Sequence, residues 1–91
     1  MDRNDGENNS IALSSLAIGA SGTVARLDLE AELAAWLRAV GIGEGDRVDV
    51  LRAGALGGPL HVRNSAGGEF ALNRQLAQSI HVTPTRTAPG S

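Results

Sequence analysis

AAWLRAVGIGEGDRVDVL, residues 34–51, changes its hydrophobic pattern halfway along. The first half spaces apolar residues like one face of an amphipathic helix, and Gly41 follows them, where helices commonly end in a left-handed residue. From Asp46 onward, apolar and polar residues alternate with the period of a half-buried strand. The sequence therefore predicts a helix that passes directly into a strand through a tight turn at Gly43 and Gly45.

The predicted helix begins upstream, after Asp28. Its apolar residues follow a helical spacing and form a single stripe, made of Leu29, Leu33, Trp36, Leu37 and Val40. Asp28 is the predicted N-cap, and two glutamates in the first turns complement the helix dipole. At the other end, Ile42 is expected to fold back on Leu37 in a Schellman ending. The place of Trp36 on the stripe predicts packing in the core or at its edge.

Four further short strands are predicted from the remaining chain. Together with the strand after the helix, the five predicted strands span residues 23–27, 46–52, 60–63, 69–72 and 79–82. The broken alternation of the first strand indicates a bulge or a strand covered on both faces. Residues 74–78 suit one helical turn. The sequence therefore predicts a mainly β fold, a strongly bent sheet or small, partly open barrel of about five strands with one helix between strands 1 and 2.

Length and composition restrict the class of protein. A chain of 91 residues has room for one domain, and with no cysteine its core gains nothing from disulfides or cysteine-bound metals. Nucleic-acid binding usually needs a basic stripe, whereas this chain has a net charge of -2 and scattered arginines. Aromatic residues make up 2% of the chain, too few to form a groove for proline-rich ligands. An SH3-type binder of such ligands is therefore disfavoured.

The ends of the chain differ from its centre in composition. Residues 1–10 are polar and do not resemble a signal peptide, and no apolar run reaches the roughly 20 residues that a membrane span needs. A soluble, cytoplasmic protein is therefore expected. Residues 1–10 are expected to be a disordered lead-in, residues 11–83 the folded domain and residues 84–91 a flexible tail.

The residues that could carry catalysis do not form a recognisable motif. There is no cysteine nucleophile, and no G-x-S-x-G sequence lies near a histidine. The glycines of residues 41–45 close a helix and open a strand, the reverse of a nucleotide-binding loop, and the chain has no lysine to complete a Walker-type loop. No catalytic residue and no cofactor are predicted.

Two histidines, His61 and His81, are predicted on the polar faces of their strands. In a small barrel they could come within reach of Asp49 or Glu69 and form a metal site. Their spacing matches neither a helical pair nor a zinc ribbon, so solvent-facing histidines are favoured and no metal ligand is assigned.

The order and spacing of several motifs resemble the FeoA family of ferrous iron transport proteins. The similar segments are residues 37–50, 58–60, 70–72 and 76–82. The resemblance implies an SH3-like barrel and a non-enzymatic, cytoplasmic accessory protein that works with the membrane transporter FeoB and modulates its transport or GTPase cycle. The related C-terminal barrel of iron-dependent repressors gives an alternative, a metal-responsive regulatory or chaperone module that would use His61 and His81.

For the accessory role, the predicted contact surface comprises two glycine-rich segments, the loop of residues 53–60 and the turn of residues 41–45. Exposed glycine-rich loops offer backbone and apolar contacts without large charge. The predicted partner-binding residues are Gly43, Leu56, Gly57, Gly58, Pro59 and Leu60. Self-association and the direction of the effect on the transporter stay open.

Overall fold

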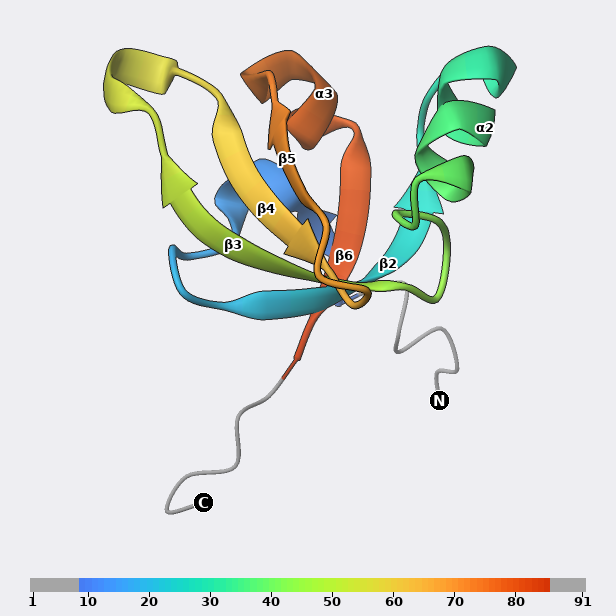
Figure 1. The fold of residues 1–91 in the computed structure, drawn as a ribbon, viewed down its shortest axis with the longest axis horizontal. Helices are drawn as coiled ribbons and strands as arrows, with labels where there is room; N and C mark the ends of the chain where they lie inside the picture. The colour runs from blue at the N-terminus through green and yellow to red at the C-terminus, as the bar shows by residue number, and fades with distance from the viewer. Residues whose placement is uncertain (1–8, 86–91) are drawn as a thin grey trace.

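Six strands form one antiparallel sheet in the order β1-β6-β2-β3-β4-β5 (Figure 1). The computed structural model describes residues 9–85. The strands are β1 Ile11–Ala12, β2 Ser21–Leu27, β3 Arg47–Ala53, β4 Leu60–Asn64, β5 Glu69–Leu72 and β6 Ile80–Pro84. The helices are α2 Ala31–Ala39 and α3 Arg74–Gln78, with 3-10 turns η1 Leu13–Ser15 and η2 Ala55–Gly57. Within the described range, no helix is long and apolar enough to cross a membrane.

The predicted count of five strands is wrong, because β1 is a sixth strand that pairs with β6. Two residues are too few for alternation to reveal a strand. Helix α2 consequently lies between the second and third strands. The sheet is also not closed, since edge strands β1 and β5 do not pair with each other within residues 9–85. After β1 the chain turns into η1, which packs against α3.

The register of the sheet follows from the hydrophobic pattern of its strands. In β3, Val48 and Val50 are 0% and 1% exposed, as the alternation predicts. In β2, the pairing with β6 shifts between Val24 and Arg26, so the predicted bulge is confirmed. The core inside the curved sheet is aliphatic, and its largest fully buried side chains are Leu13, Leu37, Ile42, Leu60, Ile80, Val24, Val48, Val50, Val62 and Val82.

Helix α2 ends as predicted and begins later than predicted. Gly41 has a φ of 94°, its N–H donates to the Arg38 carbonyl at 3.2 Å, and the Ile42 N–H donates to the Leu37 carbonyl at 2.8 Å. These two bonds are the Schellman pair. The predicted N-cap is wrong, because the capping position is Glu30 and the N–H of Asp28 donates instead to the carbonyl oxygen of Ser79, at 2.9 Å.

The apolar stripe of α2 is only partly buried. Leu37 is fully buried, whereas Leu33 and Trp36 are 37% and 48% exposed. Trp36, which was predicted to pack in the core or at its edge, is therefore not in the core. The helix meets the core through Ala34 and Leu37, whereas Leu33, on the neighbouring face, lines an open groove beside α3.

Candidate partner-binding groove

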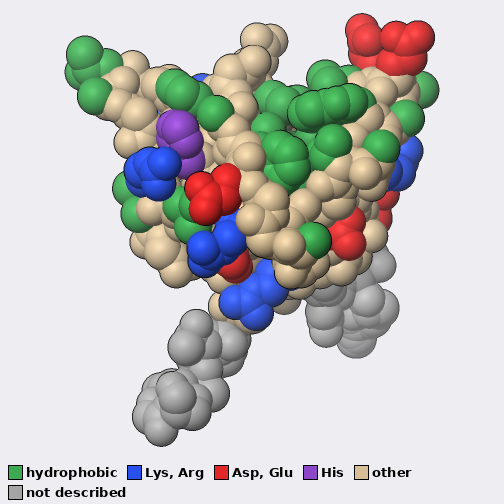
Figure 2. All heavy atoms as spheres, in the orientation of Figure 1, with side chains coloured by type: hydrophobic (Ala, Val, Ile, Leu, Met, Phe, Trp, Pro, Cys, Tyr) green, Lys and Arg blue, Asp and Glu red, His purple; other side chains and the backbone are tan. Residues whose placement is uncertain are grey.

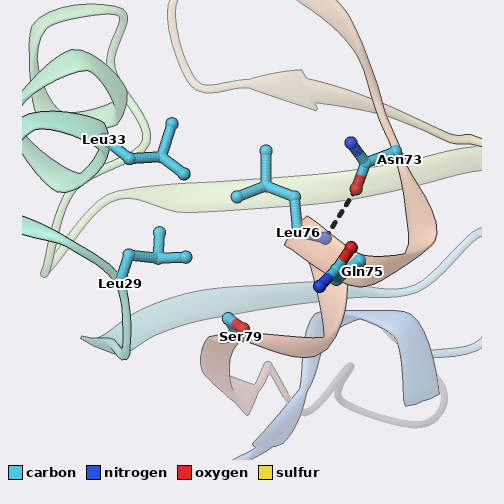
Figure 3. A pocket seen from close by; sticks show the side chains of 6 residues that line it. All are labelled: Leu29, Leu33, Asn73, Gln75, Leu76 and Ser79. Atoms are coloured by element: carbon cyan, nitrogen blue, oxygen red, sulfur yellow. Dashed lines mark hydrogen bonds between the residues drawn. The ribbon is translucent and has the colours of Figure 1, made fainter.

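A groove of about 290 Å³ lies between α2 and α3 (Figure 3). Its lining residues are Leu29, Leu33, Asn73, Gln75, Leu76 and Ser79. Figure 3 shows Leu29 and Leu33 pointing from the side of α2 towards Leu76, with the three polar side chains on the side of α3. The groove therefore combines an apolar interior with uncharged hydrogen-bonding groups along one wall.

The α3 wall is fixed by Asn73. Its Oδ1 atom accepts a hydrogen bond from the N–H of Leu76 at 2.7 Å, and its carbonyl accepts from the N–H of Ala77 at 3.0 Å. Asn73 is thus the N-cap of a helix only five residues long. At the base of the groove, the backbone bond from Asp28 to Ser79 joins the two walls. The Asn73 cap thus fixes the start of α3, and the Asp28–Ser79 bond ties this wall to the segment that precedes α2.

The α2 wall extends the apolar surface beyond the groove itself. Leu33 and Trp36 are three residues apart and lie on the same face of the helix. Figure 2 shows hydrophobic side chains gathered on the surface between β5 and α2, with acidic side chains at the upper end of α2. Large apolar side chains rarely gather on a protein surface without a partner. This combination of groove and exposed helix face is the strongest candidate site in the described part of the chain.

The C-terminal end of α2 is held by an exposed ion pair. Arg38 donates from Nε and Nη2 to the two carboxylate oxygens of Glu44, both at 2.9 Å. The Arg38 hydrogen bond is the main reason that the pKa of Glu44 is lowered to about 2. The following turn is closed by the N–H of Gly43, which donates to Asp46 Oδ2 at 2.8 Å. Because both ion-pair side chains are exposed, the pair orients the turn more than it stabilises the fold.

A second polar cluster lies on the outer face of the sheet. Ser21 donates a 2.6 Å hydrogen bond to Asp49 Oδ1, and the Nε of Arg47 donates to the same oxygen at 3.1 Å. Arg63 approaches Asp49 Oδ2 at 3.7 Å. The pKa of Asp49 is lowered, first by the Ser21 hydrogen bond and then by the two arginines. The carboxylate is satisfied by its neighbours, so this cluster ties β2, β3 and β4 together.

The six residues predicted to bind a partner are not brought together on one surface. Leu60 is 2% exposed, so its expected exposure is wrong; it pairs with Ala53 and Leu72, and its side chain belongs to the core. Gly43 is buried too, and a Cβ there would lie 2.9 Å from Arg38 Cγ. Neither side chain position is available to a partner.

The tip of the β3–β4 loop is exposed, as predicted. Leu56 is 104% exposed and has a φ of 57°, and Gly57 and Pro59 are exposed while Gly58 is partly buried. In Figure 1 this tip lies at the upper left and α2 at the upper right, with β4, β5 and α3 between them. Leu33, which lines the groove, and Trp36, on the same face of α2, were not among the predicted partner-binding residues. The width of the apolar stripe, too broad for one buried helix face, was the signal that could have identified them.

The histidines are also held apart. His61 lies on β4, opposite Arg52 and Ala71, and His81 lies on β6, opposite Ala12 and Arg26. Strands β4 and β6 are separated by β2 and β3 in the sheet. Within residues 9–85, no group of three or more His, Cys, Asp or Glu side chains could hold a metal ion.

Comparisons with solved structures find FeoA proteins. FeoA from Chlorobium tepidum is 26% identical, with a TM-score of 0.78 over 88% of this chain and 75% of its own. FeoA from Stenotrophomonas maltophilia, solved with zinc and described as an SH3 domain protein, is 31% identical, with a TM-score of 0.67 over 84% of this chain and 96% of its own. The SH3-like fold implied by the motifs is therefore supported.

A repressor shares the same domain. A manganese-dependent transcriptional repressor in complex with manganese is 27% identical, with a TM-score of 0.74 over 84% of this chain and only 37% of the repressor. No curated protein sequence matches this chain at comparable significance. The model of the FeoA domain family matches residues 11–84, most of the 91-residue sequence. The chain therefore belongs to the FeoA domain family, which is implicated in ferrous iron transport.

Proposed function

We propose that this protein is a cytoplasmic accessory module of ferrous iron uptake that docks on a FeoB-type transporter and modulates its transport or GTPase cycle. The observation that carries the proposal is the open groove between α2 and α3, bordered by the exposed side chains of Leu33 and Trp36. Membership of the FeoA family supports the link to ferrous iron, which is here the cargo of the partner.

The chemistry of the groove supports binding of a protein segment over catalysis. Its six lining residues are leucines, amides and one serine, and none of them titrates near neutral pH. Apolar grooves with a few hydrogen-bonding groups at the rim are typical of surfaces that receive a partner's side chains. A non-enzymatic role is accordingly part of the proposal.

Binding to the transporter tests the proposal directly. The full chain is titrated onto the detergent-solubilised FeoB-type transporter from the same source, with and without GTP and ferrous ion. We expect saturable association, and we expect Leu33→Glu to weaken it at least tenfold, because a buried unpaired carboxylate costs much of an anchor's binding energy. The absence of saturable association under all four conditions would refute the proposal.

The loop of residues 53–60 is the competing contact site. Leu56→Asp is a matched variant, because it also places a carboxylate on an exposed leucine but does not line the groove. We expect binding to survive this change. A variant that folds normally and no longer binds would move the contact from the groove to the loop tip, and would leave the accessory role intact.

A metal-responsive regulatory module is the second candidate, favoured by the similarity to the manganese-dependent repressor. In this case the metal, bound with the help of His61 or His81, would be the ligand. Isothermal calorimetry with ferrous and manganous ions separates the two candidates. We expect no saturable heat at micromolar metal, whereas binding that is lost in His61→Ala and His81→Ala would favour the second candidate.

A further inference from the structure

We infer that the groove accepts a basic amphipathic segment, in which apolar anchors enter between α2 and α3 and flanking Lys or Arg side chains meet Glu30 and Glu32. This inference rests on the proposed function, because it names the part of a transporter that would dock. It adds a selectivity for positive charge that family membership does not supply.

The apolar half of the inference follows from the shape of the site. A volume of about 290 Å³ is at the lower limit of small-molecule pockets, which span roughly 300–1,000 Å³. The apolar surface nevertheless continues from Leu29, in the segment just before α2, to Leu33 and Trp36 on the helix itself. Leu33 and Trp36 are spaced i and i+3, about 4.5 Å apart along the helix axis. A shallow site with an extended apolar border suits a helix that places two or three anchor side chains across it.

The charged half follows from the start of α2. Glu30 is the residue at the capping position, Glu32 lies in the first turn, and both side chains are exposed. Figure 2 shows acidic side chains at this end of the helix, next to the hydrophobic surface. The opposite wall offers only the neutral groups of Asn73, Gln75 and Ser79. The lining of the groove is thus uncharged, and Glu30 and Glu32 place negative charge at the start of α2 beside it, so complementary charge favours a basic occupant and disfavours an acidic one.

Two considerations favour a protein segment over a lipid surface. The chain carries a net charge of -2, and the cytoplasmic leaflet is negatively charged, so the two repel each other. Transporters, by contrast, concentrate Lys and Arg in the cytoplasmic segments next to their membrane spans. A basic segment beside a membrane span therefore has both the charge and the apolar residues that the groove selects.

Two designed peptides test the inference on the full chain. One is an 18-residue helical peptide with leucines at i, i+4 and i+7 and lysines on its polar face, and the other has glutamate in place of every lysine. Each carries fluorescein, and binding is followed by anisotropy. Trp36 is the only tryptophan of the chain, so its emission gives an independent signal at the edge of the groove. At 0.15 M salt we expect the lysine peptide to bind about tenfold more tightly, and at 1 M salt we expect this difference to shrink.

Variants of the chain assign the effect to the groove. The double variant Glu30→Gln and Glu32→Gln is expected to remove most of the preference for lysine, and Leu33→Asp to weaken both peptides at least tenfold. If Leu33→Asp does not fold, Trp36→Glu takes its place, because that side chain is 48% exposed. Leu56→Asp is the control and is expected to bind like the wild type.

Three results would overturn the inference. They are equal affinity for both peptides at 0.15 M salt, a preference for lysine that survives the double glutamine variant, and binding to phosphatidylserine vesicles that matches binding to the lysine peptide. The outcome is separate from that of the proposed function. If the transporter binds and the peptides show no charge preference, only the inference fails. If lysine selectivity holds and the transporter does not bind, only the proposed function fails.

Discussion

The side-chain amide of Asn64 donates a 2.8 Å hydrogen bond to the carbonyl oxygen of Val40, 24 residues away in sequence. Val40 is the C-cap of α2. The other end of the Asn64 amide, Oδ1, accepts from the N–H groups of Ala66 and Gly68 at 3.1 and 2.8 Å. One buried side chain thus joins the end of the helix that lines the groove to the turn between β4 and β5.

Asn64→Ala is therefore expected to destabilise the fold by about 2–4 kcal/mol, because it leaves two N–H groups and one carbonyl without their partner. Urea unfolding measures the effect as a lower midpoint with an unchanged slope. Ser65→Ala, at the exposed neighbouring position, is the control and should change stability by less than about 0.5 kcal/mol. A loss below about 1 kcal/mol in Asn64→Ala would show that water replaces the amide.

The same amide restricts Gly41. A Cβ at this position would lie 2.7 Å from Asn64 Nδ2, and φ is 94°. Gly67 has the same φ of 94°, but a Cβ there would meet nothing within 4 Å. Both glycine-to-alanine variants carry the cost of a left-handed residue, about 1–2 kcal/mol. Gly41→Ala should lose a further 1–3 kcal/mol or so, because the added carbon displaces Asn64 from Val40. Thermal unfolding of the two variants side by side measures this difference, and equal losses would contradict it.

Acid sensitivity should be altered by Ser21→Ala. The hydrogen bond from Ser21 is the largest cause that lowers the pKa of Asp49. A carboxyl whose pKa is lower in the folded state stabilises the fold above its unfolded pKa, and the contribution disappears as pH falls through the folded pKa. Ser21→Ala should therefore raise the pKa of Asp49 towards its usual range. The free energy of unfolding should then differ less between neutral and acidic pH than it does in the wild type.

Carbon-detected NMR titration of the Asp49 carboxyl tests this expectation. Arg63→Gln is the matched comparison and should raise the pKa less, because the Arg63 Nε lies 3.7 Å from the carboxylate whereas the Ser21 oxygen lies at 2.6 Å. A larger shift in Arg63→Gln would assign the main effect to charge instead of to the hydrogen bond.

Helices, strands and turns of this fold were predictable where a local pattern of residues encodes them. Residues 69–72 and 74–78 form β5 and α3 with the predicted bounds, and the Schellman ending at Gly41 is present. The pattern could not reveal β1, because two residues have no measurable period and pair only once β6 is in place. The open edge between β1 and β5 depends likewise on how the sheet curves.

The candidate site was less predictable than the fold, because exposure depends on tertiary packing. Leu60 and Leu56 lie in the same glycine-rich segment, yet Leu60 faces the core and Leu56 faces solvent. Likewise, Leu33 and Leu37 share one apolar stripe, and only Leu37 meets the core. Periodicity identifies an apolar face, but the groove exists because α3 stands beside only part of that face.

Leu56 offers a final test, because neither its left-handed backbone conformation nor its exposure to solvent favours leucine at this position. Its φ and ψ of 57° and 44° are left-handed, where asparagine and glycine are tolerated better than a branched side chain. Leu56→Asn should therefore stabilise the fold by about 0.5–1 kcal/mol, a rise of a few degrees in Tm for a domain of this size. Differential scanning calorimetry measures the change, and a lower Tm would show that the side chain packs on the loop.

The same variant separates the two contact sites without adding a charge. If the groove receives the transporter, Leu56→Asn should bind it with unchanged affinity while being more stable than the wild type. If binding falls while stability rises, the side chain of Leu56 contributes to partner binding, because nothing in the isolated fold would favour leucine over asparagine at this left-handed position.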